Sequence, residues 1–95
     1  MNLDKFFEKR GYCRANTGGG CAAYQYTEEN GDYISIADET AVPENFRSSC
    51  YVTLYNKEGE ELRSWKAGSV MEALTIAAWN VREYYADQGK QVGEG

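Results

Sequence analysis

The sequence predicts an α+β protein in which a four-stranded antiparallel sheet of two hairpins packs against a long C-terminal helix, with a short helix at the N-terminus. Three observations support this fold class. First, apolar residues recur at helical spacing between Ser69 and Gln88. Second, two preceding stretches have the pattern of paired strands joined by turns that end in glycine. Third, residues 2–10 also have a helical pattern. A length of 95 residues fits one core. We therefore predict a single domain over residues 1–88 and a flexible, glycine-rich tail over residues 89–95.

The first element is a predicted short helix over residues 2–10. Asn2 is a suitable N-cap, and Leu3, Phe6 and Phe7 lie at i, i+3 and i+4, so the two phenylalanines must be buried against the rest of the chain. The following residues, 12–21, end in Asn-Thr-Gly-Gly-Gly and predict a flexible loop. This loop lacks the glycine spacing of phosphate-binding loops.

Each hairpin is predicted to turn through three residues, the last of them glycine. In the first hairpin this register places Tyr24 opposite Ile36 and Tyr26 opposite Ile34, all on one face. In the second hairpin it pairs two positions on the inner face, Leu54 with Leu62 and Val52 with Ser64. The outer face is then predicted to carry Tyr51, Thr53, Tyr55, Glu61, Arg63 and Trp65. The loop between the hairpins contains the one proline, Pro43, and a lone Phe46 that we expect at the sheet edge.

The long helix begins with a capping box formed by Ser69 and Glu72. One stripe of the helix is predicted to face the sheet: Val70, Leu74, Ala77, Val81 and Tyr85, flanked by Ala73, Ala78 and Tyr84. Ile76 and Trp79 lie on the opposite side, which makes them a candidate contact patch.

The composition argues against membrane insertion, metal binding and catalysis. Apolar runs are too short to span a bilayer and the N-terminus has no signal-peptide pattern, so we expect a cytoplasmic protein. Histidine is absent, which removes the commonest general base and metal ligand, so we predict no enzyme, no catalytic residues, no cofactor and no metal. Cys13, Cys21 and Cys50 are expected to be small buried or half-buried thiols, and a Cys13–Cys21 disulfide is the alternative.

Charge and aromatic residues indicate a binding role. Fifteen acidic residues against ten basic ones give a net charge of −5. A stretch without Lys or Arg carries six carboxylates that we predict to bind a basic partner: Glu28, Glu29, Asp32, Asp38, Glu39 and Glu44. The outer-face residues Tyr51, Tyr55, Arg63 and Trp65 are of the types that dominate protein interfaces. The alternatives are a merely solvated acidic face and aromatic residues buried beneath the short helix.

Two families share parts of this pattern. The order helix, strands, helix, with Leu3-x-x-Phe6-Phe7 ahead of the strands, resembles a double-stranded-RNA-binding domain, although residues 68–72 lack the lysines that such a domain uses to reach phosphates. Ser69-x-x-Glu72-Ala73-Leu74 at the helix start resembles HicB-type antitoxin domains. As a short acidic α+β chain with exposed aromatic residues, the protein is also similar to small phage-encoded inhibitors of the anti-CRISPR type.

These observations favour a non-catalytic protein-binding module. The preferred hypothesis is a phage or mobile-element inhibitor that binds a basic, nucleic-acid-handling protein complex through an acidic surface that mimics nucleic acid. One alternative is a direct nucleic-acid-binding or antitoxin-like regulator. Another is a homodimeric structural protein associating through Tyr51, Tyr55 and Trp65.

Overall fold

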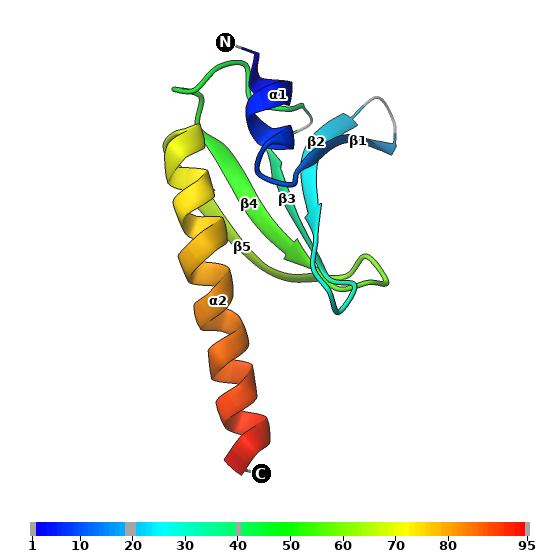
Figure 1. Ribbon diagram of the computed structural model, residues 1–95, viewed down its shortest axis with the longest axis vertical. Coiled ribbons are helices and arrows are strands. Elements are labelled where there is room, and N and C mark those ends of the chain that lie inside the picture. Colours follow the sequence, from blue (N-terminus) through cyan, green and yellow to red (C-terminus); the bar gives the residue numbers. More distant parts are fainter. Residues whose placement is uncertain (1, 19–20, 40, 95) are drawn as a thin grey trace.

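The computed structural model describes residues 2–18, 21–39 and 41–94, and it is an α+β protein (Figure 1). Its elements in chain order are α1 (Leu3–Glu8), β1 (Cys13–Gly18), β2 (Cys21–Thr27), β3 (Tyr33–Ala37), β4 (Cys50–Tyr55), β5 (Glu61–Ala67) and α2 (Val70–Glu94). The strands form one antiparallel sheet in the order β1-β2-β3-β4-β5. The predicted fold class is confirmed, but the sheet has five strands rather than four.

The additional strand, β1, comes from the segment predicted to be a flexible loop. It pairs with β2 from Cys13 opposite Gln25 to Gly18 opposite Cys21, with an irregularity between Asn16 and Gly18. As an edge strand, β1 needs only one partner and leaves Cys13 and Asn16 exposed. It therefore shows no alternation of apolar residues, which is why composition alone suggested a loop. The predicted loop residues 19–20 lie outside the described residues.

Helix α1 begins and packs as predicted. The side chain of Asn2 accepts a hydrogen bond from the backbone N–H of Asp4 at 2.8 Å. Phe7 is fully buried, and its ring stacks on Tyr24 of β2 with centroids 4.0 Å apart. Phe6 packs edge-on against Phe46 at 4.8 Å, so these two rings close one end of the sheet. The short helix is thus held by tertiary contacts, as its length requires.

Helix α2 has the predicted cap, shifted slightly in one of its bonds. The hydroxyl of Ser69 accepts from the N–H of Glu72, whereas the Glu72 carboxylate accepts from the N–H of Gly68 rather than Ser69. The helix continues to Glu94, so the predicted end at Gln88 is wrong: residues 89–93 contain no proline to stop it. Flexibility of the predicted tail remains a prediction, and residue 95 lies outside the described residues.

The first hairpin has the predicted register. Tyr24 lies opposite Ile36 and Tyr26 opposite Ile34, and Gly31 closes the turn with a φ of 95°. Backbone bonds between Glu28 and both Asp32 and Gly31 complete the three-residue turn. Because β3 also pairs with β4, Ile34 and Ile36 stand in the middle of the core face.

The second hairpin differs from the prediction by a β-bulge. Its turn is the predicted one and Tyr55 lies opposite Glu61, but the register then shifts, so Leu54 pairs with Arg63 and Val52 with Trp65. Leu62 is the extra residue of the bulge. Leu62 and Trp65 are three residues apart and both pack against the core. A regular strand would send them to opposite faces, and the bulge is what brings both to the apolar side.

Both helices cover the same face of the sheet (Figure 1). Helix α1 contacts β1, and α2 contacts β4 and β5. The core between the helices and the sheet contains these buried side chains, among others: Phe7, Tyr24, Ile34, Ile36, Val52, Leu54, Val70, Ala73 and Val81. The prediction of which side of α2 faces the sheet is therefore correct, although Ala78 is exposed. The other face of the sheet carries neither helix.

Candidate functional site: the open face of the sheet

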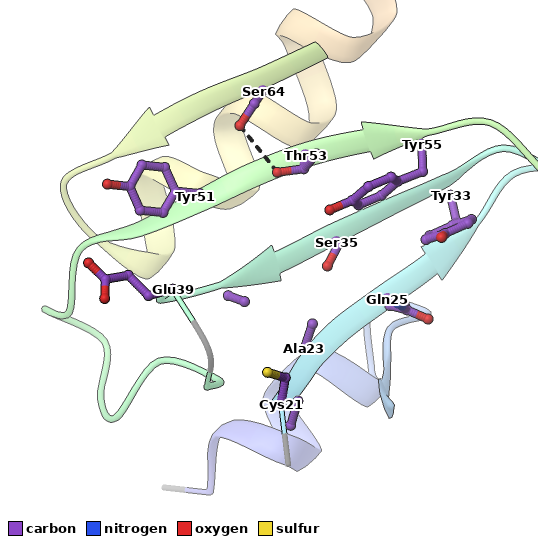
Figure 2. Close-up of a pocket in the computed structure, with 12 residues that line it drawn as sticks. Cys21, Ala23, Gln25, Tyr33, Ser35, Glu39, Tyr51, Thr53, Tyr55 and Ser64 are labelled. Atoms are coloured by element: carbon purple, nitrogen blue, oxygen red, sulfur yellow. Dashed lines mark hydrogen bonds between the residues drawn. The ribbon is translucent and has the colours of Figure 1, made fainter. Parts of the chain in front are cut away.

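We call the uncovered surface the open face. It is hollowed, with a cavity of about 410 Å³. Its lining comes from four strands and the loop after β3, as Figure 2 shows: Cys21, Ala22, Ala23, Gln25, Tyr33, Ser35, Ala37, Glu39, Tyr51, Thr53, Tyr55 and Ser64. Most of these residues alternate with core residues along their strands, so the strand period of two places them on one side.

Small residues in the middle and tyrosines at the ends shape the hollow (Figure 2). Ser35, which is 8% exposed, and Ala23 form part of the low centre. At one end the rings of Tyr33 and Tyr55 stack with centroids 5.1 Å apart and planes 22° apart. At the other end Tyr51 is 40% exposed. The open face therefore presents flat aromatic surface, hydroxyl groups and a depression that a protruding side chain can enter.

Only half of the predicted aromatic set lies on this face. Tyr51 and Tyr55 do, but the bulge turns Arg63 and Trp65 to the helix side, where Trp65 packs against the core. The guanidinium of Arg63 lies 5.5 Å from the centre of the Trp65 ring. The prediction that all four share one surface is therefore wrong. Sequence reasoning missed Tyr33. Its position two residues before Ser35, in alternation with Ile34 and Ile36, was a usable signal.

The six predicted acidic residues do not form one surface. Glu28, Glu29 and Asp32 lie at the β2–β3 turn, whereas Asp38, Glu39 and Glu44 follow the other end of β3 (Figure 1). Strand geometry puts the two groups about 20 Å apart. Glu39 nevertheless lines the hollow near Tyr51 (Figure 2). The carboxylate of Asp32 is already engaged, since the Tyr85 hydroxyl of α2 donates to it at 2.7 Å.

The fold instead brings together the acidic residues of two turns. A Cβ atom on Gly31 would lie 3.1 Å from that of Lys57, so the β2–β3 and β4–β5 turns are neighbours. We call their carboxylates the acidic end: Glu28, Glu29, Asp32, Glu58, Glu60 and Glu61. Lys57 is the one basic residue within these two turns. The stacked Tyr33 and Tyr55 lie at the same end of the sheet. The two turns are far apart in the sequence, so the sequence analysis did not identify this cluster.

Glu28 provides a test of the charge at the acidic end. Burial, and then the charges of Asp32 and Glu29, raise the pKa of its carboxyl group. The folded chain therefore holds the proton of the Glu28 carboxyl group more tightly than the unfolded chain does. The free energy of unfolding consequently falls as the pH rises above the ordinary carboxyl pKa. We expect Glu28→Gln to raise the melting temperature slightly at pH 7 but not near pH 3, measured by circular dichroism. Glu58→Gln, at an exposed position, is the control; equal shifts at both pH values would contradict the argument.

The second predicted patch is divided by the structure. Trp79 is 62% exposed on α2, as expected, whereas Ile76 is half-buried and packs against the core cluster. Ile76 is therefore partly a core residue. A single exposed tryptophan remains of this patch.

The cysteines occupy three different environments. Cys50 is buried, which raises the pKa of its thiol to about 11, whereas Cys21 is half-buried and Cys13 is exposed, contrary to expectation. Cys13 lies opposite Gln25, four residues from Cys21 along β2, so their Cα atoms are about 13 Å apart by strand geometry. This rules out a disulfide between them in this fold. Among the described residues, no group of three or more Cys, Asp or Glu side chains could hold a metal ion.

With this geometry established, the chain can be compared with known proteins. No family model, curated protein or solved structure matches it. In the part of the chain that the structure describes, no helix combines the length and hydrophobicity needed to cross a membrane. The function must therefore be inferred from the open face and the acidic end themselves.

Proposed function

We propose that this chain is a non-catalytic protein-binding module that contacts a basic partner through its open face and acidic end. The observation that carries the proposal is the uncovered sheet face, where Tyr51 and the Tyr33–Tyr55 stack surround a hollow of about 410 Å³. Tyrosine supplies large contact area with little loss of conformational entropy, and it is enriched among the residues that dominate binding energy.

The charge pattern supports the type of partner. Carboxylates lie at both ends of the open face, Glu39 near Tyr51 and the acidic end near Tyr33 and Tyr55. Lys66 lies opposite Tyr51 on β5, so a cation is also present beside this residue of the open face. With a net charge of −5, the chain attracts basic surfaces and repels phosphates. A protein that handles nucleic acid presents such a basic surface, so our specific proposal is an inhibitor of the phage or mobile-element type that occupies it.

The test compares three variants with the wild type in capture experiments from host lysate, with and without nuclease treatment. Tyr51→Ser with Tyr55→Ser removes aromatic surface, and Glu29→Lys with Glu58→Lys reverses charge at the acidic end. Trp79→Ser is the matched control, because Trp79 is exposed on α2, outside the open-face lining. We expect each double variant to weaken retention of the same partner at least about 30-fold, the effect of losing roughly 2 kcal/mol of binding energy.

The control variant should retain that partner as the wild type does. Retention that disappears after nuclease treatment would instead make nucleic acid the ligand and favour a direct nucleic-acid-binding or antitoxin-like regulator. A dimer of the wild type in sedimentation equilibrium that the tyrosine variant dissociates would favour the homodimer. Equal retention of wild type and both double variants would contradict the proposed surface.

A further inference from the structure

The helix side of the sheet contains a second hollow that the proposed function does not use. It is a groove of about 500 Å³ between the middle of α2 and the turn that follows α1. Ile34 lies at its floor; Tyr12 and Tyr26 form one wall, and Leu74, Ala77 and Val81 belong to the α2 wall. A volume of this size is typical of small-molecule sites. The groove lies between the part of the sheet that α1 contacts, β1, and the part that α2 contacts, β4 and β5.

Two arginines line this groove, Arg10 from the turn that follows α1 and Arg82 from α2. Arg10 is held in place, because it donates to the carbonyl oxygen of Phe6 at 3.0 Å and lies 3.7 Å over the Phe6 ring. Arg82 is exposed on α2. Within the described residues the ion pair found is Arg14 with Asp4, so neither Arg10 nor Arg82 has a carboxylate within 4.0 Å.

We propose that this groove binds a small amphipathic anion, with an apolar chain between the walls and a single carboxylate at the guanidinium groups. The apolar walls favour a hydrocarbon chain, and a planar guanidinium matches a carboxylate with two parallel hydrogen bonds. Glu28 also lines the groove and repels additional negative charge. The arrangement therefore fits a monoanion better than a dianion. This site lies on the other face of the sheet from the open face, and Glu28 is the residue that it shares with the acidic end.

The experiment uses octanoate and octylamine, which share an apolar chain and carry opposite charges. Both are titrated into the full chain near pH 7, with nuclear magnetic resonance shifts recorded for backbone amides. We expect octanoate to bind saturably, to shift amides of Tyr26, Ile34 and Ala77, and to bind about tenfold more tightly than octylamine, as a charge-assisted hydrogen bond provides. Absence of saturable octanoate binding, or equal affinity for the two probes, would overturn the proposal.

Variants then locate the site. Arg10→Gln and Arg82→Gln are each expected to weaken octanoate binding several-fold and to leave octylamine binding unchanged. Arg63→Gln, which removes the same charge from β5 outside the groove lining, should have no effect. Ala78→Trp fills the groove from an exposed helix position with little risk to the core, and it should abolish binding of both probes. Unchanged octanoate binding by Ala78→Trp would also overturn the proposal.

Discussion

Replacing Leu54 with alanine is expected to lower the free energy of unfolding by about 3 to 4 kcal/mol. Leu54 has no exposed surface, and β4, the strand that carries it, lies in the sheet between β3 and β5 and beneath α2. Removing its three terminal carbon atoms loses their burial and leaves a cavity. Hydrogen bonds to strands on both sides hold β4 in place, so the surroundings have little freedom to collapse into that cavity.

Urea denaturation followed by circular dichroism measures this loss. The midpoint should fall while the slope of free energy against urea stays the same, because the surface exposed on unfolding barely changes. Leu62→Ala is the matched control: Leu62 is half-buried at the bulge, so its loss should be clearly smaller. A loss at Leu54 no larger than that at Leu62 would contradict the position of the core described above.

Gly11→Ala is expected to destabilise the chain by about 2 to 3 kcal/mol, from two effects that add. Gly11 has a φ of 88°, a conformation that costs a residue with a side chain energy. A Cβ atom there would also lie 2.8 Å from Cε2 of Tyr26, whose ring packs against Tyr12 with centroids 5.4 Å apart. The turn connects α1 to β1, so its displacement would disturb the stacking of Phe7 on Tyr24.

Gly59→Ala separates the two effects. Gly59 has nearly the same φ, 87°, but a Cβ atom there would meet its nearest neighbour, the Tyr33 hydroxyl, at an ordinary 3.6 Å. It should lose only the backbone contribution, about 1 to 2 kcal/mol. Thermal or urea unfolding of the two variants gives the comparison. Equal losses would show that Tyr26 moves aside at little cost and that the turn after α1 is not tightly packed.

Local signals in the sequence were sufficient for much of the fold. The caps at Asn2 and Ser69 and the register of the first hairpin depend on hydrogen bonds and side-chain alternation within a few residues. These were predicted correctly because the interactions that decide them are local in sequence. The buried stripe of α2, from Val70 to Val81, followed from helical periodicity in the same way.

The candidate site was harder to predict because one bulged residue decides it. Leu62 and Trp65 both reach the core, so the strand must contain an extra residue, and this residue moves Arg63 and Trp65 off the open face. The spacing of three between two apolar residues was present in the sequence. A regular hairpin register, however, was consistent with the turn and with Leu62 facing the core. No local interaction disfavoured an exposed tryptophan.

Local sequence patterns by themselves determined the two helix caps, the two hairpin turns and, in the first hairpin, the alternation of core-face and open-face residues. Tertiary structure decided which elements are neighbours. It added β1 as an edge strand beside β2, placed α1 and α2 on one face, and joined the turns at Gly31 and Lys57 into the acidic end. These features depend on contacts between residues that are far apart in the chain. A local sequence pattern does not indicate the energies of such contacts.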